Sequence, residues 1–108
     1  MRPSIRWIPR SLACAFLLCA AAHAATPELL ATKAGCAACH LANKKLLGPS
    51  YHEIAVKYRG DAKAPAALAA KVRTGGTGVW GKAKMLPLDA RKISDADLAT
   101  VIGWILRQ

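Results

Sequence analysis

The chain has 108 residues, and its 16 lysine and arginine residues outnumber 6 aspartate and glutamate residues to give a formal net charge of +10. This length allows one small domain, and domains of this size, which bury little apolar surface unaided, often use a further stabilising element such as a disulfide, a metal or a cofactor. The hydrophobic share of 54% is raised by an apolar N-terminal segment, so it does not indicate a membrane protein.

The first 24 residues have the layout of a secretory signal peptide. Arg2, Arg6 and Arg10 form a positive segment, residues 12–22 form an unbroken apolar run, and Ala22-His23-Ala24 supplies a small-x-small cleavage pattern. The apolar run is shorter than the roughly 20 residues that a transmembrane helix needs. We therefore expect cleavage after this pattern and no stable membrane insertion, with an uncleaved anchor as the second interpretation.

Cleavage at this point divides the chain into a signal peptide, residues 1–24, and a mature domain, residues 25–108. Cys14 and Cys19 are lost with the signal peptide, which leaves two of the 4 cysteines. A lipid-modified N-terminus at Cys19 is disfavoured, because the preceding Leu18 is bulkier than the small residue that lipoprotein signals carry there. The mature domain has a formal charge of +7, since three basic residues and no acidic residue precede residue 25.

A first helix is predicted to start at Thr26-Pro27-Glu28. These residues place threonine at the N-cap, proline at the first helical position and an acid in the first turn. The helix carries Leu29 and Leu30 and should end near Gly35.

The next segment, Cys36-Ala37-Ala38-Cys39-His40, has the C-x-x-C-H form of a c-type haem attachment site. Two thiols at this spacing can each form a thioether bond with a haem vinyl group, and the imidazole that follows can bind the iron as the proximal ligand. Cys36, Cys39 and His40 therefore predict one covalently bound haem c. A bound haem also supplies a large apolar group around which so small a domain can pack.

Two other interpretations of the cysteine pair are weaker. A structural zinc site needs four ligands, and no second cysteine pair remains in the mature domain. A dithiol redox motif would need a βαβ setting, whereas strand-like alternation is scarce in this sequence.

Residues 41–47 are expected to form a loop that ends in Gly48-Pro49. Ser50-Tyr51-His52-Glu53 is a capping box, and it opens a second helix that closes at Gly60. A third helix is predicted to start at Pro65 and to end before Gly75-Gly76.

Residues 75–81 are rich in glycine and predict a bend. A phosphate-binding loop is rejected, because the strand and the Gly-Lys-Ser/Thr ending of such loops are missing. Ser94 caps the last predicted helix, whose apolar residues follow the i, i+3, i+4, i+7 pattern of an amphipathic helix: Leu98, Val101, Ile102 and Ile105. The mature domain is thus predicted to be all-α.

Met85 is the only methionine after residue 25, and it lies in a loop marked by glycines and by Pro87. Its thioether would complete the His/Met iron ligation that raises the potential of electron-carrying cytochromes. A lone methionine is more often core filler, and His52 is a competing ligand, but a histidine early in a capped helix is usually solvated. The predicted metal ligands are therefore His40 and Met85.

These features resemble the small bacterial class I cytochromes c of the cytochrome c551/c552 type. The likeness runs from Pro27 to Arg107 and includes the haem motif, Gly48-Pro49-Ser50-Tyr51, Gly78-Val79-Trp80-Gly81, Met85 and the last helix with Trp104. It implies a class I cytochrome c fold of four to five short helices around one covalently bound haem.

The resemblance also implies roles for further residues. The Pro49 carbonyl would accept the second N–H of the proximal imidazole. Trp80 would donate its indole N–H to a haem propionate, Lys71 would pair with the same group, and Trp104 would lie where the first and last helices cross.

The chain departs from this family around the predicted sixth ligand. Lys84 and Leu86 flank Met85 where the family commonly has prolines, and Leu88 replaces a side-chain amide that bonds the sulfur in some relatives. The segment from Met85 to Ser94 is also a few residues longer than usual. These changes bear on the geometry of Met85 ligation and on the potential.

The loops that follow His40 and precede Met85 carry Lys44, Lys45, Lys82 and Lys84. A domain of this charge is expected to be steered towards acidic redox partners such as a reductase, an oxidase or a dehydrogenase, less strongly as salt rises. The alternative is that these lysines only keep the protein soluble. Nucleic acid is not an expected partner, because export places the protein in the wrong compartment and Trp80 is assigned to haem.

The sequence therefore predicts a monomeric periplasmic electron-transfer protein, not an enzyme, that carries single electrons between redox proteins through a His/Met-ligated haem. The main alternative is a cytochrome subunit tightly bound to one periplasmic dehydrogenase. A haem enzyme or gas sensor with an open sixth position on the iron is a third possibility.

Overall fold

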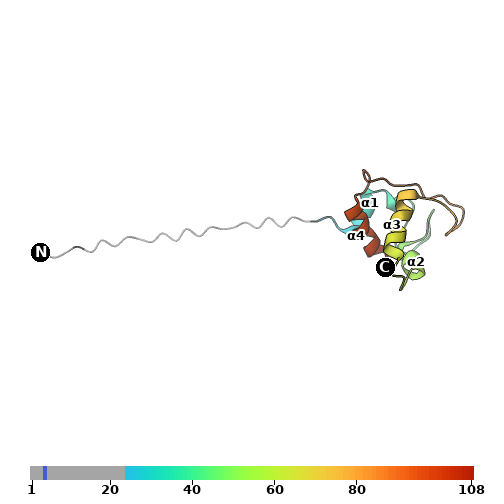
Figure 1. Cartoon of the computed structure of the whole chain (residues 1–108), viewed down its shortest axis with the longest axis horizontal. Helices are drawn as coiled ribbons and strands as arrows, with labels where there is room; N and C mark the ends of the chain where they lie inside the picture. The colour runs from blue at the N-terminus through green and yellow to red at the C-terminus, as the bar shows by residue number, and fades with distance from the viewer. Residues whose placement is uncertain (1–3, 5–23) are drawn as a thin grey trace.

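The computed structural model of the protein describes Ser4 and residues 24–108 (Figure 1). Within these residues the chain forms four α-helices and one 3-10 turn, with no strand beyond a single bridge between Gly76 and Met85. The predicted all-α fold of four to five short helices is confirmed. The predicted signal peptide lies almost entirely outside the described residues. None of the described helices is long and apolar enough to cross a membrane.

Helix α1, Pro27–Lys33, begins where its capping residues predict. The Thr26 hydroxyl accepts a hydrogen bond of 3.2 Å from the Leu29 N–H, which satisfies one of the free donors of the first turn. After the helix, Gly35 adopts a left-handed conformation, with φ of 92°. This reversal leads directly into the 3-10 turn η1, Cys36–Ala38, so the haem motif begins at the end of α1.

Helix α2, Tyr51–Lys57, is opened by the predicted capping box. The Glu53 N–H donates to the Ser50 hydroxyl at 3.0 Å, and the Ser50 N–H donates to the Glu53 carboxylate at 2.7 Å. Ser50 is almost fully buried whereas Glu53 is exposed, so the reciprocal pair satisfies the buried N–H and hydroxyl of Ser50. The helix ends three residues before Gly60, which lies in the turn that follows.

Helix α3, Ala64–Thr74, starts one residue before Pro65, because proline fits anywhere in the first turn of a helix. It ends before Gly75 as predicted. Helix α4, Asp95–Ile105, is capped by the Ser94 hydroxyl, which accepts from the Asp97 N–H at 3.1 Å.

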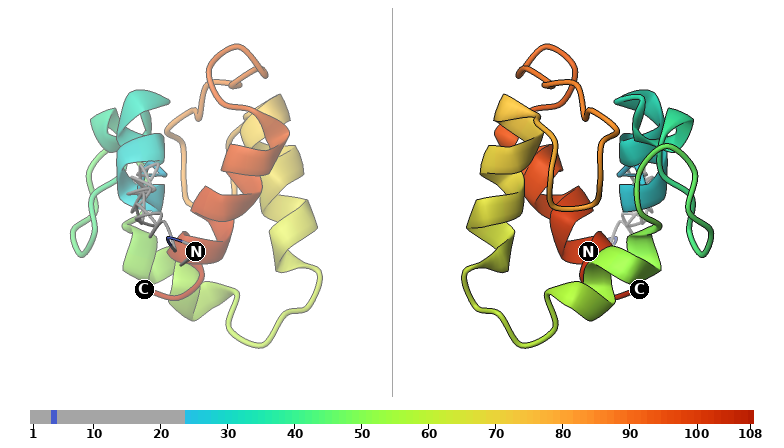
Figure 2. Two further views of the ribbon diagram at one scale, coloured as in Figure 1. Left: turned by 90° about the vertical axis from the view of Figure 1, so that its left-hand side faces the viewer. Right: turned by 90° about the vertical axis from the view of Figure 1, so that its right-hand side faces the viewer.

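The core lies where α4 packs against α1 and α3. Figure 2 shows α4 (red) crossing the middle of the domain, with α3 (yellow) on one side and α1 (cyan) on the other. The buried residues of this core are Ala31, Ala34, Ile93, Leu98, Val101 and Ile102. Ala31 of α1 and its C-cap residue Ala34 are both buried in this core, so the start of the haem motif is held against α4.

Replacing Glu53 with glutamine should make the protein less stable at neutral pH and should flatten its acid transition. Hydrogen bonds from the Ser50 backbone N–H, then from its side chain, lower the pKa of Glu53 below the ordinary value of 4.5. A carboxylate with a lowered pKa contributes stability above its ordinary pKa and loses it as the pH falls through the lowered value.

Urea denaturation of wild type and Glu53→Gln between neutral and acidic pH checks this. The difference in free energy of unfolding between wild type and Glu53→Gln should shrink as the pH falls below 4.5. Glu28→Gln, which removes a first-turn carboxylate of α1 outside any capping box, is the matched control. A gap that is independent of pH would contradict the role of the Glu53 charge.

Candidate haem site

The predicted haem-binding cysteines and histidine lie on one helical turn. The N–H groups of Cys39 and His40 both donate to the Cys36 carbonyl, at 3.1 and 2.9 Å. The spacing i, i+3, i+4 on such a turn places Cys36, Cys39 and His40 on the same side of it. Both cysteines are half-buried and neither is in a disulfide. The two thiols and the imidazole therefore face one common region.

The environment of Cys36 disfavours dithiol redox chemistry. Burial raises the pKa of the Cys36 thiol, with a smaller contribution from the neighbouring Cys39. Redox-active C-x-x-C pairs instead have a lowered pKa, because the thiolate is the reactive form. Cys36 thus lacks the lowered pKa that is typical of a thiol exchange site.

The orientation of His40 is set by the loop that follows it. The His40 Nδ1–H donates to the carbonyl oxygen of Pro49 at 2.7 Å. A backbone carbonyl can only accept, so Nδ1 carries the hydrogen and Nε2 keeps a free lone pair for a metal. The Gly48 N–H donates to the Cys39 carbonyl at 2.9 Å, which brings the loop back over the motif. The contact that the resemblance implied for Pro49 is present in the structure.

Gly48 is a site residue that the sequence did not single out. A Cβ atom at this position would lie 2.6 Å from Cε1 and 3.0 Å from Nδ1 of the His40 ring. Its φ lies outside the left-handed range, so backbone conformation is not what requires glycine here. Glycine is required because the imidazole occupies the space.

An aromatic series connects His40 to the last helix. The His40 and Tyr51 rings are stacked with centroids 5.9 Å apart, and Tyr51 meets Trp104 edge-on at 5.1 Å. Tyr51 is 6% exposed. Its burial, with smaller contributions from Cys36 and Glu28, raises its pKa to about 12, so the hydroxyl stays neutral. Trp104 also packs against the core formed with α1, which agrees with its predicted place near the helix crossing.

Met85 is fixed by backbone pairing rather than by helix packing. Its N–H donates to the Gly76 carbonyl at 2.9 Å, and its carbonyl accepts from the Gly76 N–H at 3.0 Å. A Cβ on Gly75 would collide with the Met85 carbonyl, so the chain needs glycine at the point of contact.

Lys71 and Trp80, the two predicted propionate contacts, occupy different settings. Lys71 is half-buried, and its Nζ lies 3.3 Å from the position that a Cβ on Gly76 would take, so the ammonium lies beside the Gly76–Met85 pairing. Trp80 is 37% exposed. The Lys57 ammonium lies over its ring, 5.5 Å from the centroid, which is a cation–π contact between α2 and the glycine-rich loop.

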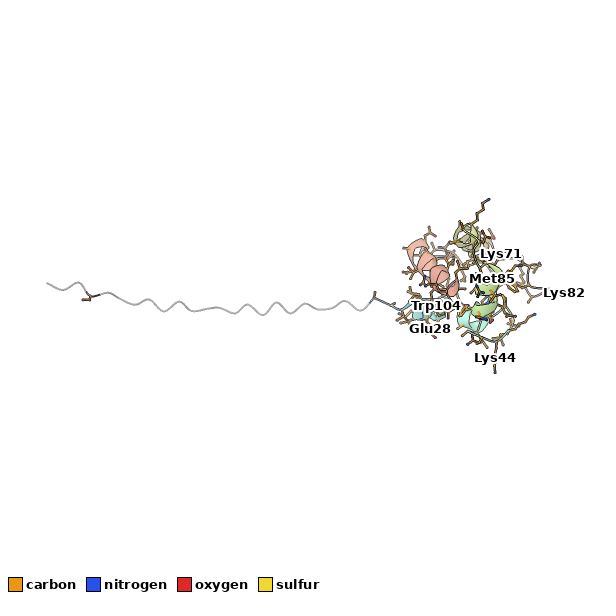
Figure 3. All side chains as sticks on the ribbon, turned by 90° about the horizontal axis from the view of Figure 1, so that it is seen from below. Glu28, Lys44, Lys71, Lys82, Met85 and Trp104 are labelled. Carbon is orange, nitrogen blue, oxygen red and sulfur yellow. The ribbon has the colours of Figure 1, made fainter. Side chains whose placement is uncertain are left out.

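The competing ligand His52 is exposed and lines an open pocket with Glu53, Val56, Lys57 and Trp80. The four loop lysines, Lys44, Lys45, Lys82 and Lys84, are all exposed. In Figure 3, Lys44 and Lys82 extend from the edge of the domain, whereas Met85 lies among its elements.

The residues of this site fit a haem. Cys36 and Cys39 supply two free thiols, His40 supplies one free imidazole nitrogen, and Met85 supplies a thioether. The loops that carry these groups also expose large apolar side chains, and clusters of such side chains mark binding surfaces: Leu41, Leu46, Leu47, Val79, Trp80 and Leu86.

Comparison with known proteins agrees with this fit. The sequence model of the family described as cytochrome c matches residues 25–108. The chain is 59% identical over 83 residues to cytochrome c2 of Rubrivivax gelatinosus, covering 77% of this chain and 98% of that protein. It is 39% identical over 97 residues to cytochrome c-551 of Pseudomonas aeruginosa, covering 90% of each.

Solved structures show the same fold. The crystal structure of cytochrome c552 from Nitrosomonas europaea aligns with a TM-score of 0.66 at 41% identity and covers 72% of this chain and 94% of that one. The class 1 cytochrome MtoD from Sideroxydans lithotrophicus aligns with the same TM-score at 32% identity. The chain therefore belongs to the cytochrome c family, as a bacterial class I c-type cytochrome that carries electrons on one haem c bound covalently through its C-x-x-C-H cysteines.

Proposed function

We propose that this chain is an exported, diffusible electron carrier, not an enzyme, and that the Nε2 atom of His40 and the sulfur of Met85 would hold the haem iron. Haem ligated in this way supplies a one-electron redox couple and has no free position for a small gas. The observation that carries the proposal is the backbone pairing of Met85 with Gly76. It holds the only thioether of residues 25–108 at a defined place in a loop that otherwise consists of glycines and exposed side chains.

The other site residues have supporting roles in this proposal. Cys36 and Cys39 hold the porphyrin, and the Pro49 carbonyl keeps the His40 ring in one tautomer and one orientation. Trp80 and Lys71 would bind the propionates through the indole N–H and the ammonium. The apolar side chains of the two loops would exclude water from the haem. This exclusion favours one-electron transfer over exchange of the iron ligands.

The proposal includes removal of residues 1–24 and a periplasmic location. The family match begins at residue 25, where the small-x-small pattern ends. An alignment of 83 residues also accounts for 98% of the Rubrivivax gelatinosus protein, a length close to that of residues 25–108. N-terminal sequencing of the exported protein should give Ala25 as the first residue.

The absorption spectrum of the oxidised holoprotein tests the ligation. Sulfur–iron coordination gives a weak near-infrared charge-transfer band, which should be present at neutral pH. Size-exclusion chromatography of a native periplasmic extract tests whether the protein is a free carrier. The protein should elute as a free domain, and co-elution with a catalytic chain would contradict this part of the proposal.

The partner is proposed to present an acidic surface to the loop lysines. The bimolecular electron-transfer rate with such a partner should fall by about tenfold or more between about 0.01 M and about 1 M ionic strength, over which the Debye length shrinks from about 30 Å to about 3 Å. A variant with Lys44, Lys45, Lys82 and Lys84 changed to glutamine should lose most of this dependence.

Lys63→Gln is the matched control for the lysine variant. Lys63 is exposed and lies at the N-terminus of α3, at the opposite end of that helix from Gly75 and the Met85 loop. Stopped-flow measurement should show the control to be as sensitive to salt as wild type. If Lys63→Gln instead lost about a quarter of the salt dependence lost by the four-lysine variant, net charge rather than a docking face would steer association, because the control removes one charge and the variant removes four.

A further inference from the structure

Arg73 connects α3 to the segment that leads from Met85 to α4. It lies in the last turn of α3, and its side chain is 24% exposed. One terminal nitrogen donates to the Leu88 carbonyl at 3.1 Å, and the other donates to the Ile93 carbonyl at 2.9 Å and to the Asp95 carboxylate. One guanidinium thus binds the start and the end of residues 88–93 and the first residue of α4.

The chain just before this segment is held by the backbone alone. Met85 pairs with Gly76, and the Leu88 N–H donates to the Val72 carbonyl at 2.9 Å. The intervening Leu86 is 69% exposed, and Pro87 is the only proline between residues 76 and 94. Since Gly76, Gly78 and Gly81 have positive φ values, the sequence before Met85 has little intrinsic rigidity. The position of Met85 therefore depends on contacts from α3.

The chemistry of arginine suits this contact. Hydrogen bonds from a charged donor are roughly twice as strong as neutral ones. The two terminal nitrogens of a planar guanidinium can also donate to two carbonyls that lie in different directions. Arg91 offers a useful contrast, because it lies in the same segment but its side chain bonds only to Asp89 and is 91% exposed.

We propose that Arg73 is a positioning residue for Met85, and that its three contacts set how firmly the sulfur stays on the iron. The inference rests on the proposed ligation by His40 and Met85. Without the guanidinium, residues 88–93 lose two hydrogen bonds to α3 and keep the one from the Leu88 N–H to the Val72 carbonyl, beside the apolar packing of Leu88 and Ile93. The sulfur should then leave the iron more often, which an external ligand can detect.

The test is the rate at which potassium cyanide binds the oxidised holoprotein at neutral pH. Arg73→Met should bind cyanide roughly tenfold faster than wild type, a change equal to about one hydrogen bond, and its reduction potential should move downward. Arg91→Met should stay within about twofold of wild type, because the exposed Arg91 side chain forms hydrogen bonds only to Asp89. Arg73→Lys keeps the charge but has no second terminal nitrogen. Its cyanide-binding rate should therefore lie between those of Arg73→Met and wild type.

Global destabilisation is separated from positioning by Val101→Ala, which lowers stability through the core, where Val101 is 2% exposed. Its cyanide rate should match wild type. The inference is overturned if Arg73→Met, or Arg73→Lys where the former does not fold, binds cyanide at the rate of wild type or no faster than Val101→Ala. A wild-type protein without the near-infrared sulfur band would instead overturn the ligation itself.

Discussion

Replacing Met85 with alanine is expected to abolish the near-infrared sulfur–iron band and to let the reduced protein bind carbon monoxide stoichiometrically. Residues 25–108 contain no second thioether that could take its place. Alanine keeps the backbone pairing with Gly76 available, since that pairing uses only the N–H and carbonyl of residue 85. The variant therefore removes the ligand and leaves the loop, and its reduction potential should fall because methionine ligation raises the potential.

Leu86→Ala is the matched control for this change. Leu86 neighbours Met85 and is 69% exposed, so truncating it removes apolar surface from the same loop without removing a ligand. Its near-infrared band and its lack of reaction with carbon monoxide should match wild type. An unchanged spectrum in Met85→Ala would show that another residue is the sixth ligand, with exposed His52 and Lys84 the first to test by substitution.

Replacing Gly48 with alanine is expected to lower the free energy of unfolding of the holoprotein by about 2–4 kcal/mol, the sum of an overpacking cost and a lost buried hydrogen bond. The added Cβ would lie 2.6 Å from His40 Cε1, so the imidazole must move. Movement of the ring breaks its 2.7 Å bond to the Pro49 carbonyl and its stacking on Tyr51. Haem would remain covalently attached through Cys36 and Cys39, but the His40 ligation should weaken.

Gly103→Ala separates this local clash from the general effect of adding a methyl group. Gly103 lies inside α4, and a Cβ there would meet only the end of the flexible Arg107 side chain, at 3.3 Å. Because alanine favours helix over glycine by up to about 1 kcal/mol, this variant should be as stable as wild type or slightly more so. Denaturant unfolding measures both variants, and equal stability of the two would contradict the packing of Gly48 against His40.

The helix starts could be predicted because they depend on chemistry within four residues. Thr26, Ser50 and Ser94 were all predicted as caps, and each accepts the expected hydrogen bond in the structure. The C-x-x-C-H motif predicted the haem for the same reason, since its spacing alone brings the groups together on one turn. Helix ends were less well predicted: α2 stops at Lys57, well before the glycine that was expected to close it.

Contacts between distant segments could not be predicted from the sequence. Nothing in the local pattern links Lys57 to Trp80, or Arg73 to the Leu88 and Ile93 carbonyls, because these pairs depend on how helices pack. Gly75 was noted as a turn residue, and Gly48 as the end of a loop and as part of a motif shared with the family, whereas the structure shows each in contact with a group of the site. The ligand role of Met85 and the propionate contacts of Trp80 and Lys71 stay predictions.

The central claim is that the iron is closed by a nitrogen on one side and a sulfur on the other. The most direct measurement is to expose the reduced, exported holoprotein to carbon monoxide at neutral pH and record its absorption spectrum. No change is expected, because the Met85 sulfur would occupy the position that the gas needs if the proposed ligation holds. A prompt shift of the haem bands on addition of carbon monoxide would contradict it.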